Sequence, residues 1–283
     1  MIDTIDARLN ELIDKCEKSS LREAMAYSVF AGGKRIRPML LLGACEAALG
    51  RFTEPALDFA CALEMIHTYS LIHDDLPAMD NDDLRRGKPT SHKQFGEAMA
   101  ILAGDALLNR AYETMAKQVC KMEPETAEAM AVIAAAAGDN GMIAGQVDDI
   151  YFQDKQLDKS TLFNIHEKKA GALFSAAFYS GALLGGADPP YVQAMEQIGG
   201  KLGLAFQILD DILDITATQE TLGKPVNSDI RNKKNTYVSV HGMDKSWGDY
   251  RKISEEVLAG LDRLNQKTPA LRNIVVQAIE RER

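Results

Sequence analysis

ALEMIHTYSLIHDDLPAMD, at residues 62–80, and LGLAFQILDDILD, at residues 202–214, each join an apolar helical stretch to a cluster of aspartates. Burying a carboxylate is costly unless a positive charge lies close to it. Two such clusters that face each other would form a cage of oxygen ligands, which hard divalent cations prefer. These stretches therefore predict buried helices that converge on a cation site.

The aspartates of the second stretch are spaced for a helix. Asp210 and Asp214 are four residues apart and lie on one helical face, where they are expected to bind cations together. Gln207 shares that face, and Asp211, about 100° further round, is kept as a metal-site candidate. Oxygen ligands favour Mg²⁺ or Ca²⁺ over Zn²⁺. A solvated acidic helix face is the alternative interpretation.

The first stretch spaces its aspartates differently. Pro77 cannot continue a helix without strain, so the backbone is expected to turn there and to bring Asp80 back toward Asp74. The two aspartates at 82–83 are expected to be solvated. A helix end followed by an acidic loop is the alternative interpretation of this cluster.

Two groups of basic residues lie near helix ends. The segment GGKRIRP at 32–38 places three cations in four positions, with Lys34 and Arg37 expected on one helical face. A helix N-terminus favours anions, and guanidinium groups such as those of Arg85 and Arg86 match phosphate oxygens in a forked geometry. The segment could hold a diphosphate, and a solvated basic turn is the alternative.

The remaining candidates are single residues. Lys169 precedes an apolar helix, and Lys224 and Lys234 lie in a polar segment at 217–235 that could close over the cation site as a lid. His67 lies two helical turns before the first aspartate cluster. Each lysine could equally be solvated, the segment could be an ordinary surface loop, and His67 could be a core residue.

Helical periodicity covers most of the chain. Aromatic residues make up only 6% of the 283 residues, and strand signals are scarce. No linker divides the chain, which predicts one all-helical domain over residues 1–283. The expected helices span about 2–17, 19–31, 35–50, 53–74, 91–119, 124–151, 159–185, 188–216, 233–242, 245–265 and 268–282.

The composition argues against several classes of protein. A net charge of −9 without a long basic run argues against nucleic-acid binding. No apolar run reaches the ~18 residues of a membrane span, and the acidic N-terminus lacks the pattern of a signal peptide. The four cysteines have no CxxC spacing and are expected to be reduced. These features predict a cytoplasmic soluble protein.

The motifs occur in an order that resembles the trans-isoprenyl diphosphate synthases, specifically the bacterial-type farnesyl diphosphate synthases. Each motif alone is modestly specific, whereas the ordered set is very specific and covers the chain from about residue 20 to residue 280. The set comprises GGKRIRP at 32–38, DDLPAMD at 74–80 with RRG at 85–87, KAG at 169–171, FQILDDILD at 206–214, GKP at 223–225 and KNTY at 234–237.

The resemblance implies a helical bundle around a deep central cavity, usually in a homodimer, in which three Mg²⁺ ions, with Mn²⁺ as an alternative, join an allylic diphosphate to the aspartates. The implied metal ligands are Asp74, Asp80, Asp210 and Asp214, supported by Asp75 and Asp211. The residues implied to hold the allylic diphosphate are Arg85, Lys169, Gln207, Lys224 and Lys234. Those implied to hold isopentenyl diphosphate are Lys34, Arg37, His67 and Arg86, and Gly33 is a further implied substrate-binding residue. Asp74, Asp80, Arg85, Lys169, Gln207, Asp210 and Lys224 are the implied catalytic residues.

One position departs from the family pattern. Threonine is common in the family where this chain has Ala170, so a hydroxyl that would contact the diphosphate is absent. Residue 170 is expected to contribute to substrate binding through its backbone alone.

The implied reaction is chain elongation. The metals and cations stabilise the departing diphosphate of dimethylallyl or geranyl diphosphate, which weakens the allylic C–O bond. The double bond of isopentenyl diphosphate then attacks the allylic cation, and the released diphosphate is the implied acceptor of the proton that leaves.

Product length is expected to be set by the floor of the cavity. Tyr69, five positions before Asp74, would block a tail longer than a farnesyl group, while the small Ser70 leaves some room. This predicts (2E,6E)-farnesyl diphosphate as the main product. A geranylgeranyl diphosphate synthase is the nearest alternative. A class I terpene cyclase or an inactive partner subunit is less favoured, because the chain keeps both aspartate motifs.

Overall fold

The computed structural model describes residues 1–121, 123–216, 234–265 and 267–280. Within these residues the chain is a bundle of helices with one short hairpin, which confirms the predicted all-helical class. The hairpin pairs β1 (Leu84–Arg85) with β2 (Lys88–Pro89). The helices are α1 (Ile2–Asp14), α2 (Ser19–Val29), α3 (Ile36–Leu49), α4 (Glu54–Asp74), α5 (Ser91–Phe95), α6 (Glu97–Val119), α7 (Pro124–Ala137), α8 (Met142–Tyr151), α9 (Lys159–His166), the π-helical η1 (Glu167–Gly171), α10 (Ala172–Leu184), α11 (Pro189–Thr216), α14 (Tyr237–His241), α15 (Met243–Arg263) and α16 (Ala270–Ile279).

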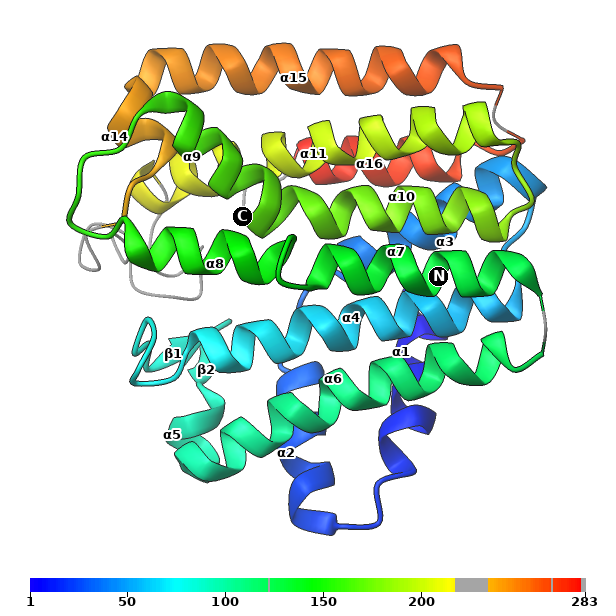
Figure 1. The fold of residues 1–283 in the computed structure, drawn as a ribbon, viewed down its shortest axis with the longest axis horizontal. Helices are drawn as coiled ribbons and strands as arrows, with labels where there is room; N and C mark the ends of the chain where they lie inside the picture. The colour runs from blue at the N-terminus through cyan, green and yellow to red at the C-terminus, as the bar shows by residue number, and fades with distance from the viewer. Residues whose placement is uncertain (122, 217–233, 266, 281–283) are drawn as a thin grey trace.

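Helix α4 runs through the bundle and carries the first aspartate cluster at its end (Figure 1). Thr53 caps its first turn by accepting a hydrogen bond from the amide of Ala56 at 3.2 Å. Buried side chains on this helix, among them Phe59, Leu63 and Ile66, occur on nearly all of its faces. A helix buried all round lies between neighbouring helices, and at its end Asp75 is buried whereas Asp74 is half-buried.

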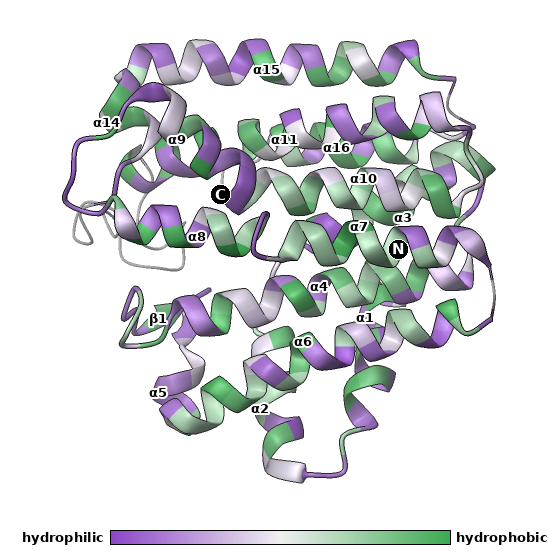
Figure 2. Cartoon of the chain, viewed as in Figure 1, coloured by the Kyte–Doolittle hydropathy of each residue, from purple (hydrophilic) through white to green (hydrophobic). Residues whose placement is uncertain are grey.

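The hydropathy of the helices follows their depth in the bundle. Figure 2 shows α10 apolar along most of its length, and its residues Phe174 and Phe178 are fully buried. The outer helix α15 alternates between hydrophilic and hydrophobic residues in the same view, and buries Val257 and Leu261 on one face. Helix α10 packs against α11 and also contacts α4.

Three predicted helices are interrupted. The helix predicted at 124–151 consists of α7 and α8, which are separated at residues 138–141. The helix predicted at 91–119 consists of α5 and α6, separated at Gly96, whose φ of +85° is easily adopted only by glycine. The helix predicted at 159–185 includes η1 between α9 and α10. Periodicity misses these breaks because the residues on both sides remain helical.

The described ranges include no helix that is both long and apolar enough to cross a membrane. All four cysteines are free thiols; Cys45 and Cys61 are buried, whereas Cys120 is exposed. Most of the candidate lid at 217–235, including Lys224, lies outside the described residues.

Candidate functional site

A cavity of about 1080 Å³ opens beside the end of α4. Most of the residues singled out from the sequence line it, and they come from the turn before α3, α4, the hairpin, η1 and α11. These lining residues are Gly33, Lys34, Arg37, His67, Tyr69, Ser70, Asp74, Arg85, Arg86, Lys169, Ala170, Gln207 and Asp210. The predicted sites for cations and for anions therefore open into one space.

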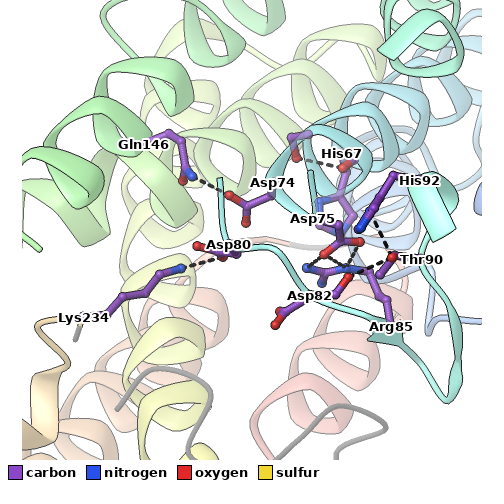
Figure 3. Close-up of polar contacts among 11 residues, drawn as sticks. His67, Asp74, Asp75, Asp80, Asp82, Arg85, Thr90, His92, Gln146 and Lys234 are labelled. Carbon is purple, nitrogen blue, oxygen red and sulfur yellow. Dashed lines mark hydrogen bonds and ion pairs between the residues drawn. The ribbon is translucent and has the colours of Figure 1, made fainter. Parts of the chain in front are cut away.

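The first aspartate cluster folds back on itself as predicted. Helix α4 ends at Asp74, and the amide of Asp80 donates to the carbonyl of Asp74 at 2.9 Å, so the turn at Pro77 brings the two aspartates together. Gln146 of α8 donates from its side chain to the carboxylate of Asp74 (Figure 3). The prediction that Asp82 is solvated is wrong, because this residue, two positions before β1, is only 4% exposed.

Asp75 is paired with an arginine. Its carboxylate accepts hydrogen bonds from Arg85 Nε at 2.8 Å and from Arg85 Nη2 at 2.7 Å (Figure 3). Burial raises the pKa of Asp75 to about 6, even though the neighbouring guanidinium acts in the opposite direction. Asp75 thus anchors Arg85, which itself lines the cavity.

Two lysines meet a carboxylate that the sequence did not single out. Asp149 Oδ2, on α8, lies 2.7 Å from Lys169 Nζ and 3.7 Å from Lys234 Nζ. Lys234 Nζ is also 2.6 Å from Asp80 Oδ2. Burial opposes the charge of Asp149, but the lysines outweigh it and lower the pKa of this carboxyl group. Gln146 and Asp149 are three residues apart on one face of a helix that is apolar except for these two residues and Asp148, and this spacing is the signal that could have identified them.

Lys169 lies in a π-helical turn. A π-helix widens the backbone locally and is frequent at functional sites. Helix α8 approaches this turn closely, because a Cβ atom added at Gly145 would lie only 2.4 Å from the Lys169 amide nitrogen. Ala170, next in the turn, is 5% exposed and still lines the cavity.

The aspartates of the second cluster lie in two different surroundings, the cavity and the protein interior. Asp210 lines the cavity, whereas Asp211 is 3% exposed and accepts from Gln207 Nε2 at 2.8 Å and from the Tyr237 amide at 2.6 Å. The carboxylate of Asp211, a metal-site candidate from the sequence, thus holds the start of α14. The amide of Gln207 likewise turns to Asp211, four residues further on, rather than to Asp210. Asp214 is 2% exposed.

The basic turn at 32–37 and the hairpin lie against each other. Gly32 and Gly33 have φ values of +107° and +117°, and a Cβ atom at Gly33 would lie 2.6 Å from the Arg86 guanidinium. Arg86 donates to the carbonyl of Gly32. Lys34 and Arg37 both line the cavity. The expectation that they share a helical face is wrong, because α3 begins only at Ile36.

His67 lies among arginines. Arg37 Nη1 is 3.3 Å from His67 Nε2 and can donate to it, and the Arg37 guanidinium lies 4.7 Å from the centre of the Phe174 ring. Burial and the charges of four arginines hold the pKa of His67 well below its ordinary value of 6.5. A neutral His67 accepts from Arg37 without adding to the positive charge of this end of the cavity.

The cavity has an apolar end beside the aspartates. Tyr69 is 6% exposed and meets the ring of His73 edge-on, with the ring centroids 5.7 Å apart. Ser70 donates from its hydroxyl to the carbonyl of His67 at 2.8 Å. The facing wall comes from α8 and consists of Met142, Ile143, Val147 and Ile150. This end suits a hydrocarbon chain.

The carboxylates suit a hard cation by their chemistry. Oxygen donors from α4 and α11 line the same cavity, and Mg²⁺ is bound by oxygen ligands. Among the described residues, no three His, Cys, Asp or Glu side chains converge closely enough to hold a metal by themselves. Further oxygen atoms, such as those of a diphosphate, would be needed to complete such a site.

Comparisons with known proteins agree with this arrangement. A farnesyl diphosphate synthase from Geobacillus stearothermophilus is 50% identical over 236 residues, which cover 82% of this chain and 79% of the relative. A geranylgeranyl diphosphate synthase from Cyanophora paradoxa is 45% identical over 254 residues, covering 89% and 84%. The crystal structure of a geranyltransferase from Helicobacter pylori, complexed with magnesium and isoprenyl diphosphate, superposes with a TM-score of 0.85 at 33% identity and covers 97% of this chain and 93% of that one.

The model of the polyprenyl synthetase family matches residues 18–275, a range that includes both aspartate clusters, the basic turn and η1. The similarity therefore extends over nearly the whole bundle and every element that lines the cavity. This chain belongs to the polyprenyl synthetase family and is a chain-elongating prenyltransferase.

Proposed function

We propose that this prenyltransferase condenses isopentenyl diphosphate with dimethylallyl or geranyl diphosphate and releases (2E,6E)-farnesyl diphosphate as its main product. One observation carries the proposal: a single cavity combines a basic turn, aspartates from two helices and an apolar end at Tyr69. Two anionic head groups and a growing hydrocarbon tail could be held together in such a space.

The cationic residues at the cavity fall into two groups, which suggest two diphosphate sites. Gly33, Lys34, Arg37, His67 and Arg86 would hold isopentenyl diphosphate, since these residues surround the basic turn. The residues that would hold the allylic diphosphate are Arg85, Lys169, Gln207 and Lys234, together with Lys224 from outside the described residues. Guanidinium and ammonium groups in a partly desolvated site bind phosphate oxygens strongly.

Mg²⁺ would be held by Asp74, Asp80, Asp210 and Asp214, in three ions per site, with Mn²⁺ as an alternative. Bound there, it would stabilise the negative charge that develops on the departing diphosphate. Asp75 and Asp211 would act through the groups that they hold, Arg85 and the Tyr237 amide.

The chain's own residues would then favour ionisation and protect its product. Lys169 and Lys234 would stabilise the negative charge of the leaving diphosphate. The apolar wall of Met142, Val147 and Ile150 would exclude water from the allylic cation, which water would otherwise quench. Tyr69 would stop the tail at a farnesyl length.

A geranylgeranyl product is the second candidate, because relatives of both kinds match this chain at similar identity. The buried aromatic ring of Tyr69 favours the shorter product. We further propose that residues 1–283 form one synthase domain and that the protein acts in the cytoplasm as a homodimer.

A product assay tests the proposal. The protein would be given Mg²⁺, labelled isopentenyl diphosphate and either allylic substrate, and the dephosphorylated products would be separated by chromatography. A C15 alcohol that disappears with a chelator and with Asp74→Asn is expected. A C20 alcohol would overturn the assignment of Tyr69 as the floor. Absence of any condensation would overturn the function.

A further inference from the structure

Arg35, in the middle of the basic turn, has different partners from its neighbours. Its backbone φ is +50°, a left-handed conformation that is uncommon for residues other than glycine. The guanidinium reaches Asp6 Oδ1 of α1 at 2.7 Å and Glu64 Oε1 of α4 at 2.9 Å. The side chains of Arg35 and Glu64 are each only 3% exposed, whereas that of Asp6 is 40% exposed. Glu64 on α4 is thus the buried partner of Arg35, and its charge is the less screened by solvent.

Glu64 lies on the helix that carries the rest of the site. It is three residues before His67, so the two side chains occupy one face of α4 on successive turns. Glu64 binds Arg35, and His67 contacts Arg37 at 3.3 Å. The basic turn is therefore attached to α4 at two points, and the same rigid helix ends at Asp74.

A conformation in the left-handed region persists only where its surroundings hold it. A buried carboxylate also destabilises a protein strongly when its partner is removed, so Glu64 keeps Arg35 directed into the core. Arg35 and Glu64 lie in the wall of the cavity, and with Arg35 held there, Lys34 and Arg37 line the same cavity.

We propose that the buried Arg35–Glu64 ion pair is a positioning element of the isopentenyl diphosphate site, which holds the basic turn so that Lys34 and Arg37 present their charges to the cavity. This role rests on the proposed function, and it makes the Arg35–Glu64 pair a determinant of the affinity for isopentenyl diphosphate. Arg35 does not bind the diphosphate itself in this scheme, because its guanidinium is occupied by the two carboxylates.

A matched pair of variants tests this role. Glu64→Gln removes the buried one of the two carboxylate charges that hold Arg35. Asp58→Asn is the control, because Asp58 lies on the same helix, is 3% exposed and is paired with Arg8 at 2.7 Å, outside the set of residues that line the cavity. Calorimetric titration of the full-length protein with isopentenyl diphosphate should show binding about tenfold or more weaker in Glu64→Gln and changed by less than about twofold in Asp58→Asn.

Steady-state kinetics add a readout that a general loss of stability would not produce. In Glu64→Gln, the KM for isopentenyl diphosphate should rise about tenfold, while the KM for geranyl diphosphate should stay within about twofold of the wild-type value. Equal losses for both substrates, or equal losses in the Asp58→Asn control, would overturn the positioning role.

The double variant Arg35→Met/Glu64→Met separates positioning from folding. Replacing a buried ion pair with apolar side chains often preserves stability. We expect thermal unfolding near that of the wild type, with isopentenyl diphosphate binding still about tenfold weaker. Wild-type affinity in the double variant would overturn the inference alone, whereas a wild-type protein that does not bind isopentenyl diphosphate would overturn the proposed function.

Discussion

Lys234 and Asp80 are 154 positions apart in the chain, yet Lys234 Nζ lies 2.6 Å from Asp80 Oδ2. The same ammonium group is 3.7 Å from Asp149 Oδ2, so it links the segment after α4, α8 and the approach to α14. Burial works against its charge, but Asp149, Asp74 and Asp80 outweigh that effect and raise the pKa of Lys234. The lysine stays protonated at any physiological pH.

Removing this charge should impair catalysis. Lys234→Met leaves the carboxylates of Asp80 and Asp149 without their shared cation and removes a group that stabilises the leaving diphosphate. We expect kcat to fall about 100-fold. Lys245→Met is the control, since Lys245 pairs with Asp249 on the surface of α15. Rates of the two variants within about threefold of each other would contradict the role of Lys234.

Tyr69 should limit the length of the product. Its ring is 6% exposed and lies beside the apolar end of the cavity, so Tyr69→Ala would open space below the tail. Chromatography of the products should show a shift from C15 toward C20 and longer chains. Tyr179→Ala, on α10, is the control, because the Tyr179 hydroxyl contacts Glu128 and does not line the cavity. An unchanged C15 product from Tyr69→Ala would show that the floor lies elsewhere.

Gly145 should be needed for the position of Lys169. A Cβ atom at this residue would lie 2.4 Å from the Lys169 amide nitrogen, so Gly145→Ala forces α8 and η1 apart and separates Lys169 from Asp149. Overpacking of this kind destabilises a protein by about 1–3 kcal/mol. Denaturant unfolding and steady-state kinetics should both show a loss.

Gly200→Ala is the control for that change. Gly200 lies in α11, and a Cβ atom there would meet nothing within 4 Å. The substitution should leave activity unchanged and stabilise the protein by up to about 1 kcal/mol, because alanine favours a helix more than glycine does. If Gly145→Ala behaves in the same way, the close approach of the two helices is not required.

His166 should make stability depend on pH. Burial lowers the pKa of His166 to about 4 from the ordinary 6.5. Between pH 6.5 and pH 4, His166 is therefore protonated in the unfolded chain but neutral in the folded protein. The free energy of unfolding consequently falls as the pH falls toward 4. This group should contribute about 2 kcal/mol to the fall between pH 7.5 and pH 5.

Denaturant titrations at the two pH values measure that contribution. His166→Asn should lose about 2 kcal/mol less than the wild type over the same interval, because asparagine does not titrate. Equal pH dependence in the two proteins would mean that the pKa of His166 is the same in the folded and unfolded states.

Several features could be predicted from the sequence because they are local. The apolar period of α4 and α11 identifies buried helices, and Pro77 dictates a turn that returns Asp80 to within 2.9 Å of Asp74, measured from amide nitrogen to carbonyl oxygen. A helical period and a proline act over a few residues. The order of the motifs then placed the chain in a family.

Other features depended on which side chains meet across the bundle. The sequence offered three cations at 34–37 and three aspartates at 210–214, but it did not say that Arg35 turns to Glu64 or that Asp211 turns to the Tyr237 amide. Nor did it single out Asp149 as the partner of Lys169. Each of these pairs joins elements between 20 and 29 positions apart. Only the packing of the helices decides which charge is buried against which, because the cost of burying an unpaired charge is settled where the elements meet.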